Sequence, residues 1–373
     1  MEDIRTDTVK VLLILLRAGL WEKEPEDLSL FPLSVSDWEA VFRLAQCQTV
    51  TGLVWQGVLR LPEPLLPPES LLLRWVAKAD DIERKNRRMN AAVAELYRLF
   101  QENGLHPVLQ KGQGVARLYE QPLLRECGDI DLYFPDKDEW TNAVSLIRKQ
   151  GITLQGEADG SLLYRWNGIG VEHHPRLTDI SNPFRRKYLQ ELEQTCGFQD
   201  VPLSDENGSK LLITIPSPTL ELLLINAHIM KHAFGWGVGL RQLCDMARAC
   251  YHYRNILQPD EMERIYHRLG IGKWSCLLHS FLTDYLGLPP SCWPYADQPV
   301  NTLPLLELVI EGGNFGLHTA GKSRLEEQQG WKRKRNTSYA LLNRARFSYS
   351  QAPGEAFWAY IHLLIGQKNV KRI

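Results

Sequence analysis

Two aspartates separated by one residue are the first candidates for chemistry in this chain, in the segment Gly128-Asp129-Ile130-Asp131-Leu132-Tyr133-Phe134. Alternate residues of a β-strand share one face at roughly 3.3 Å per residue, which predicts that the two carboxylates lie about 6.6 Å apart. Two like charges at that distance repel by about 2–3 kcal/mol at an effective dielectric near 20, and a divalent cation would compensate them. The alternative is a strand end at which both aspartates are solvated.

An apolar strand runs into a glycine turn upstream of the aspartates, in the segment Val108-Leu109-Gln110-Lys111-Gly112-Gln113-Gly114. Glycine lets the backbone approach a ligand closely, and a helix starting within 113–120 would offer unpaired amide donors to a phosphate. Arg125 supplies a guanidinium four residues before Asp129, either to hold a carboxylate or to bind a substrate phosphate. An ordinary strand-to-helix turn is the alternative for the Lys-Gly pair.

A predicted hairpin delivers a third carboxylate. Asn167-Gly168 separates the apolar runs 161–166 and 169–174, and this dipeptide is a strong hairpin signal between such runs. The second run carries Glu172 into a strand that we expect beside the aspartate strand. Three carboxylates next to a basic glycine turn are the set needed to hold two Mg²⁺ ions and to orient a nucleoside triphosphate. The alternative for Glu172 is an exposed position in the hairpin.

The elements around these residues predict a mixed core between two helical regions. The expected helices of the first region cover Thr8 to Trp21, a segment opened by the capping box Ser36-Asp37-Trp38-Glu39, and an amphipathic stretch over 70–103. A further helix is expected around 137–150. Pro216-Ser217-Pro218 predicts the start of a C-terminal helical domain, with serine as N-cap and proline at the first helical position.

Short runs spread along the chain carry a family resemblance. They are 109–112 and 128–132 with Tyr119, Pro122 and Arg125 between them, and the segments 45–53, 171–174, 228–232 and 243–247. Together they look like the signature of the uncharacterised bacterial nucleotidyltransferase family in the DNA polymerase beta superfamily. One departure is Gln113, which stands where the superfamily has a second glycine or a serine.

The resemblance implies an α+β fold with a polymerase-beta-type nucleotidyltransferase core, a mixed sheet with flanking helices. This core would be embedded between N-terminal and C-terminal helical regions, which gives the expected domains 1–103, 104–215 and 216–373. Members of the superfamily transfer a nucleoside monophosphate from a nucleoside triphosphate to a hydroxyl or phosphate acceptor. They use Mg²⁺ held by acids equivalent to Asp129, Asp131 and Glu172.

The catalytic hypothesis gives each candidate residue a role. Asp129 and Asp131 are expected to bridge two Mg²⁺ ions, with Mn²⁺ as a possible substitute, while Glu172 ligates the acceptor-side ion and takes the hydroxyl proton. The expected nucleotide-binding residues are Lys111, Gly112, Gln113 and Arg125. The expected acceptor-side residues are His174, His228 and Asp245. For His228 and His232, which share one face of a helix, the alternative is a place in the core.

Length, charge and cysteine usage argue against several classes of protein. The 373 residues include 43 basic and 44 acidic side chains, so there is no global electrostatic case for binding nucleic acid. Without a signal-like start or a long apolar run, the chain is expected to be cytoplasmic and without a membrane partner. Seven cysteines without a Cys-x-x-Cys pair argue against a disulfide framework and a zinc ribbon. The basic stretch 322–335 is expected to be a surface loop or lid.

Two other function classes stay open at this point. One is a nucleotide-binding or regulatory protein of the same fold that no longer transfers. The other is a metal-dependent phosphohydrolase that adds His173, His174, His228 and His232 as ligands. The sequence names neither the acceptor nor the base of the triphosphate, so ATP stands beside CTP, UTP and GTP.

Overall fold

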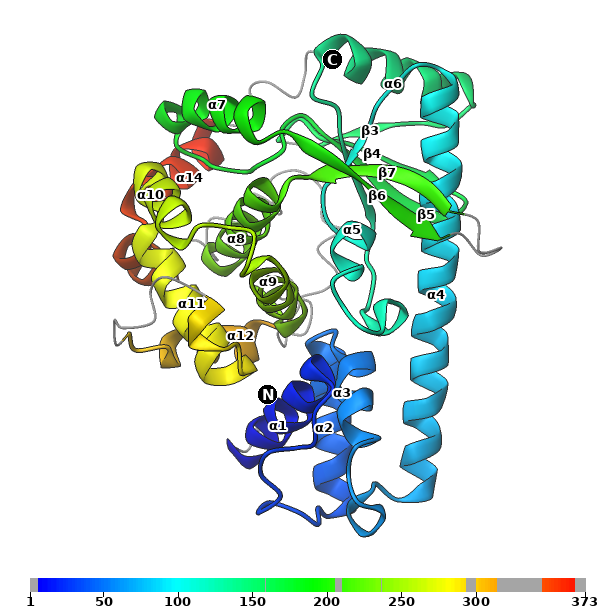
Figure 1. The fold of residues 1–373 in the computed structure, drawn as a ribbon, viewed down its shortest axis with the longest axis vertical. Helices are drawn as coiled ribbons and strands as arrows, with labels where there is room; N and C mark the ends of the chain where they lie inside the picture. The colour runs from blue at the N-terminus through cyan, green and yellow to red at the C-terminus, as the bar shows by residue number, and fades with distance from the viewer. Residues whose placement is uncertain are drawn as a thin grey trace.

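A computed structural model describes residues 6–157, 159–204, 210–235, 237–292, 300–313 and 344–365. A long helix runs along one side of the molecule and joins the N-terminal helices to a sheet, while the later helices cover the other side (Figure 1). The α+β class and the mixed sheet with flanking helices are confirmed. The basic stretch 322–335 lies outside the described residues. Of the helices that are described, none is long and apolar enough to cross a membrane.

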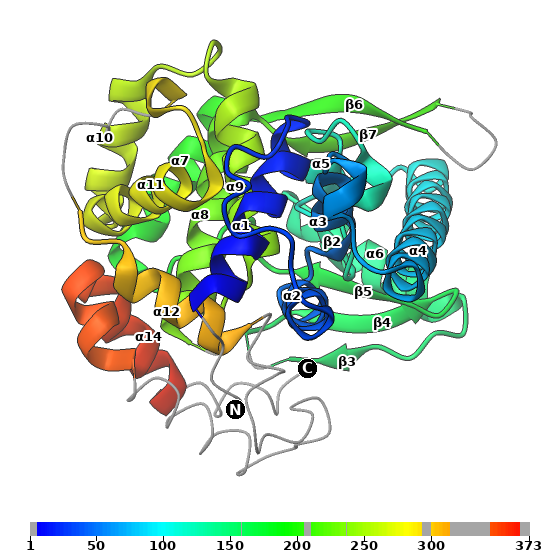
Figure 2. The ribbon, with the colours of Figure 1, turned by 90° about the horizontal axis from the view of Figure 1, so that it is seen from below.

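The N-terminal region consists of short helices packed against the start of the long one. These helices are α1 (Thr6–Trp21), α2 (Val35–Cys47), α3 (Thr51–Val58) and α4 (Glu69–Glu102), with a 3-10 turn at Glu63–Leu65. Gly19 and Gly57 let α1 and α3 pack closely, because a Cβ on Gly57 would lie 2.0 Å from the carbonyl oxygen of Leu15. Figure 2 shows α1 between α3 and the C-terminal helices, and α1 contacts both α3 and α11 (Gly272–Leu286).

The start of α2 differs from the prediction. Ser34 is the N-cap, and its hydroxyl accepts a hydrogen bond from the backbone N–H of Asp37 at 3.2 Å. The predicted cap, Ser36, already lies within the first turn because α2 begins at Val35. Both serines stand three residues before an acid, so both match a capping pattern. The extended backbone of Ser34, the conformation that an N-cap adopts, decides between them.

Seven strands form one sheet in the order β3-β4-β5-β2-β1-β7-β6. The strands are β1 (Val108–Leu109), β2 (Ile130–Tyr133), β3 (Gln155–Gly156), β4 (Leu162–Trp166), β5 (Ile169–His174), β6 (Phe198–Ser204) and β7 (Lys210–Pro216). The pairs β2–β5 and β1–β7 are parallel, and the other pairs are antiparallel. The predicted hairpin is confirmed: Asn167 and Gly168 turn between β4 and β5 with φ angles of 50° and 80°. Two positive φ angles are those of a type I′ turn.

The remaining helices lie partly next to the sheet and partly on the side of the molecule away from α4 (Figure 1). They are α5 (Gln113–Ala116), α6 (Lys137–Lys149), α7 (Arg186–Cys196), α8 (Pro218–Phe234), α9 (Leu240–Tyr253), α10 (Pro259–Leu269), α11, α12 (Leu303–Gly312) and α14 (Pro353–Ile365), with 3-10 turns at Pro122–Leu124, Pro183–Arg185 and Pro290–Cys292. The helices expected over 70–103 and 137–150 are confirmed as α4 and α6. Pro218 opens α8 as predicted, although the hydroxyl of its N-cap Ser217 makes no capping hydrogen bond.

Two apolar cores meet along α4. The first contains side chains from α1 to α3 and from α8 to α12, together with Trp75 of α4. The second contains Phe100, from the other end of α4, with strand and α6 residues. The 34 residues of α4 reach about 50 Å, which is long enough to join both cores. The hydroxyl of Tyr97 donates to the carbonyl oxygens of Pro107 and Thr214, each at 3.0 Å, and so ties α4 to β1 and β7.

Candidate active site

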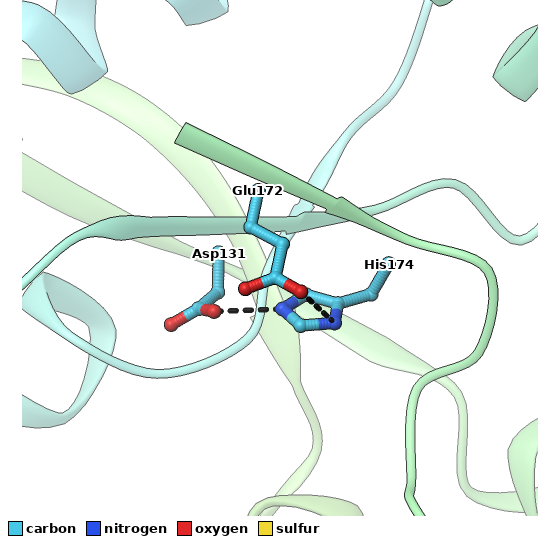
Figure 3. Close-up of side chains that lie close together, drawn as sticks. All are labelled: Asp131, Glu172 and His174. Atoms are coloured by element: carbon cyan, nitrogen blue, oxygen red, sulfur yellow. Dashed lines mark hydrogen bonds and ion pairs between the residues drawn. The ribbon is translucent and has the colours of Figure 1, made fainter. Parts of the chain in front are cut away.

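Neighbouring parallel strands bring two of the predicted acids together. In the register of β2 and β5, Asp131 pairs with Glu172 and Tyr133 pairs with His174. Figure 3 shows the side chains of Asp131, Glu172 and His174 turned toward one another. One ligand atom from each of these three residues lies within 4.8 Å of the others, and we call this group the acid cluster. The expectation that Glu172 lies beside the aspartate strand is confirmed.

Asp131 is the buried centre of the acid cluster, with 5% of its surface exposed. Its Oδ1 accepts a hydrogen bond from Nε2 of His174 at 2.7 Å and lies 3.3 Å from Nζ of Lys111. Nδ1 of the same imidazole lies 3.6 Å from Oε1 of Glu172. Burial alone would raise the pKa of Asp131, but Lys111 and His174 together hold it well below its usual range. Burial likewise opposes the charge of His174, yet its hydrogen bond to Asp131 raises the pKa of the imidazole.

Asp129 lies one residue before β2 and is exposed. The pKa of Asp129 is raised to about 6, first by the charge of Asp131 and then by desolvation. Lys111 and Arg241 act in the opposite direction and lower it. The predicted repulsion between the two aspartates is therefore present. Among the described residues, the acid cluster gains His174 and does not include Asp129.

The glycine turn joins β1 to the acid cluster. The backbone N–H of Gln110 donates to the carbonyl oxygen of Asp131 at 3.0 Å, which leads Lys111 toward the Asp131 carboxylate. Gly112 has φ 59° and ψ −116°, a conformation that suits glycine, and precedes α5. The predicted strand-turn-helix is confirmed, but α5 ends at Ala116, short of the expected 120. The side-chain amide of Gln113 donates to Asn90 Oδ1 of α4 at 2.5 Å, so it points away from the turn.

Two predicted binding residues, Arg125 and Asp245, are joined to each other. Nε of Arg125 donates to Oδ1 of Asp245 at 2.9 Å, and Nη2 donates to Oδ2 at 2.6 Å. The two residues are 4% and 6% exposed, and the hydroxyl of Tyr119 also donates to Oδ1 at 2.8 Å. Of the two alternatives for Arg125, the structure shows the guanidinium holding a carboxylate.

The remaining histidines lie at different places. His228 is half-buried, with Nδ1 3.4 Å from Nζ of Lys111, and its ring packs edge-on against His232 at 4.4 Å. His173 lies on the opposite face of β5 from the acid cluster, where Nε2 meets the Tyr164 hydroxyl at 3.0 Å. His174 and His228 therefore lie next to Lys111, whereas the position of His173 does not fit a ligand of the same metal.

A small pocket next to Lys111 contains residues that the sequence did not single out. Its lining residues are Gln110, Lys111, His174, Arg176, Leu177, Asp179, Leu224 and His228. Asp179 pairs with Lys231 of α8, with Nζ 2.5 Å from Oδ2. Burial opposes the charge of Asp179, but Lys231 holds its pKa below the usual range. The sequence carried no signal for this pair because its partners are 52 residues apart.

The acid cluster has the donor chemistry of a metal site. Two carboxylates and one imidazole are oxygen and nitrogen ligands that divalent cations such as Mg²⁺ and Mn²⁺ accept. The charge of Asp131 is the largest cause that raises the pKa of Asp129, so the two carboxylates repel each other at this edge of the sheet. A divalent cation bound there would relieve that repulsion, so the residues present fit one.

A comparison with protein families gives one match. The model of a family described as uncharacterised nucleotidyltransferase matches residues 34–287. This span contains the acid cluster, the glycine turn and the buried pair Arg125–Asp245. No curated protein and no solved structure matches the chain.

Proposed function

The chain belongs to the family of uncharacterised nucleotidyltransferases, and on that premise we propose that it transfers a nucleoside monophosphate from a nucleoside triphosphate, ATP among the candidates, to a hydroxyl or phosphate acceptor. The observation that carries this proposal is the register of β2 and β5, which sets Asp131 beside Glu172 with Lys111 in contact. Membership of the DNA polymerase beta superfamily, a cytoplasmic location and the division at residues 103 and 215 belong to the same proposal.

The acid cluster would hold a divalent cation, Mg²⁺ or Mn²⁺, through Asp131, Glu172 and His174, and Asp129 would contribute to a second ion. When bound, such cations compensate the charge of the phosphates and lower the pKa of an acceptor hydroxyl. Glu172 is half-buried and reaches the same face as Asp131. In this proposal Glu172 takes the proton from that hydroxyl.

Lys111 and Gly112 are proposed to bind the triphosphate. The side chain of Lys111 is 17% exposed and its ammonium lies 3.3 Å from Asp131, so it can neutralise phosphate oxygens that arrive at the acid cluster. Gly112 carries no Cβ and lets the backbone approach those oxygens. His228 lines a pocket together with Lys111 and His174, which makes it the acceptor-side candidate, while His174 is proposed as a metal ligand.

The test is a panel of four nucleoside triphosphates with Mg²⁺, followed by pyrophosphate release and by labelling of the protein. Asp131→Ala removes the centre of the acid cluster. Asp200→Asn is the matched control, because Asp200 accepts a hydrogen bond from Thr214 at the far edge of the sheet. We expect release with the wild type and with Asp200→Asn, and none with Asp131→Ala. Equal release with all three proteins would contradict the proposal.

The histidine in the acid cluster favours a second candidate, a metal-dependent phosphohydrolase. Imidazole ligands suit Zn²⁺, whereas Mg²⁺ and Mn²⁺ prefer carboxylates and water. This activity would release inorganic phosphate from a phosphate ester and would produce no pyrophosphate. Nucleotide binding with neither product would indicate a regulatory protein of the same fold.

A further inference from the structure

The segment that carries Asp129 has no regular secondary structure. A 3-10 turn ends at Leu124 and β2 begins at Ile130, so residues 125–129 are held by neither a helix nor a sheet ladder. A free segment of this kind samples many backbone conformations, and fixing it costs about 1–2 kcal/mol per residue. Contacts from elsewhere in the molecule must therefore set the position of Asp129. We call this segment the Asp129 loop.

The strongest of these contacts comes from α9. Asp245 holds the guanidinium of Arg125 at the start of the Asp129 loop through two hydrogen bonds, and both side chains are buried. Fork-to-fork pairs of this type fix orientation as well as distance. Burial opposes the charge of Arg125, yet Asp245 keeps the pKa of the guanidinium above its usual range. Arg241, one helical turn earlier in α9, donates from Nη1 to the carbonyl oxygen of Glu126 at 3.0 Å.

Two further helices hold the same loop. The side-chain amide of Asn86 in α4 donates to the carbonyl oxygen of Arg125 at 2.9 Å. Oε1 of Glu126 accepts a hydrogen bond from the backbone N–H of Thr51, at the start of α3, at 2.8 Å. The Asp129 loop is thus anchored by α3, α4 and α9. Of these anchors, the one from Asp245 joins two buried charges.

We propose that Asp245 and Arg125 are positioning residues: the buried pair fixes the Asp129 loop to α9 and thereby sets where the Asp129 carboxylate meets the metal. This inference rests on the proposed function for the role of Asp129, and it replaces the expectation that Asp245 contacts the acceptor and Arg125 the phosphates. Two of the guanidinium nitrogens are bound to Asp245 and the third lies 3.4 Å from the Glu126 carbonyl oxygen. A phosphate would therefore have to break an existing buried pair.

The proposal is tested on the full-length protein by hydrogen exchange of peptides covering residues 122–131. Asp245→Asn removes one charge of the pair. Glu221→Gln is the matched control, since Glu221 is also buried in an ion pair, with Arg117 at 2.9 Å, and its hydrogen bonds in the described structure join Arg117 and Tyr253 rather than the Asp129 loop. We expect exchange across 122–131 to become about tenfold faster in Asp245→Asn and to stay unchanged in Glu221→Gln. Unchanged exchange in both variants, or an equal increase in both, would overturn the proposal.

A double variant keeps the test decisive if Asp245→Asn does not fold. Arg125→Met with Asp245→Leu removes both charges of the pair together, a change that is often tolerated. We expect this variant to fold, to show the same faster exchange, and to bind Mn²⁺ about tenfold more weakly by electron paramagnetic resonance. Native exchange in this folded variant would refute the proposal.

The experiments distinguish a failure of the proposed function from a failure of the positioning proposal. Absence of Mn²⁺ binding by the wild type would argue against the function, while exchange across 122–131 would still decide whether α9 holds the Asp129 loop. Faster exchange with unchanged Mn²⁺ affinity in the double variant would show an anchor without influence on the metal, and would overturn the positioning role.

Discussion

Two groups of charged residues on either side of the Asp129 loop differ in how their charges balance. In the acid cluster and the adjacent Asp129, several carboxylates lie close together, and the charge of Asp131 raises the pKa of Asp129 to about 6. In the pair Arg125–Asp245, the carboxylate meets one guanidinium and is fully buried with it. The same residue types therefore serve different purposes. Carboxylates that repel each other near solvent can accept a cation, whereas a carboxylate paired with a guanidinium in the interior holds the chain in place.

The largest effect, a loss of activity, should come from a change at Asp129 next to the acid cluster. Asp129→Asn keeps the shape of the side chain but removes the charge that we propose for the second metal ion. Pyrophosphate release should fall by at least about a thousandfold, while circular dichroism and the melting temperature stay close to the wild type. Full activity in this variant would remove Asp129 from the mechanism.

Breaking the buried pair Arg125–Asp245 should lower the free energy of unfolding. Asp245→Asn leaves the buried guanidinium of Arg125 uncompensated, and breaking a buried ion pair in this way costs about 3–5 kcal/mol in the free energy of unfolding. Urea unfolding of the variant and the wild type measures the difference. The double variant Arg125→Met with Asp245→Leu should recover most of the loss. A change of less than about 1 kcal/mol in Asp245→Asn would mean that the pair is weaker than its geometry indicates.

A smaller effect on stability is expected at Gly112, in the turn between β1 and α5. Gly112 has φ 59° and ψ −116°, and a Cβ there would lie 3.4 Å from the carbonyl oxygen of Asp129. Gly112→Ala should lower the free energy of unfolding by about 1–3 kcal/mol, the usual cost of a strained backbone conformation. Gly104→Ala provides a comparison, because Gly104 also has a positive φ of 69° but has no atom within 4 Å of its added Cβ. Equal costs at both positions would assign the effect to backbone strain alone.

The smallest effect is a shift in the pKa of Asp129. In the metal-free protein the folded state keeps a proton on Asp129 between about pH 4 and pH 6 that the unfolded chain releases, so this group makes stability fall as pH rises through that window. Asp131→Asn removes the largest cause of the raised pKa. The midpoint for Asp129, followed by the carboxyl carbon resonance, should move from about 6 toward the ordinary value of 3.8. An unchanged midpoint would assign the shift to desolvation.

Local patterns in the sequence predicted the elements that depend on few neighbours. The hairpin at Asn167-Gly168, the start of α8 at Pro218 and the helix over 137–150 each follow from residues close together in the chain. The hairpin signal also placed Glu172 in a strand beside that of Asp131. Because alternate residues of a strand share one face, His174 lies on the same face of β5 as Glu172. The sequence therefore held a signal for the third member of the acid cluster, which had been assigned to the acceptor.

Contacts over long sequence separations could not be predicted in this way. Arg125 and Asp245 were both singled out, but they are 120 residues apart and no periodicity links them. Lys231 and Asp179 were missed for the same reason. The cap of α2 was assigned two residues too late because Ser34 and Ser36 both match the pattern and only the backbone conformation distinguishes them.

The most direct test of the central claim is Mn²⁺ binding to the wild type, Asp131→Asn and Glu172→Gln, measured by electron paramagnetic resonance. If β2 and β5 together build a cation site, each variant should bind Mn²⁺ at least about tenfold more weakly than the wild type, since even partners outside the ligand set cost that much. Equal Mn²⁺ affinity in all three proteins would contradict the account.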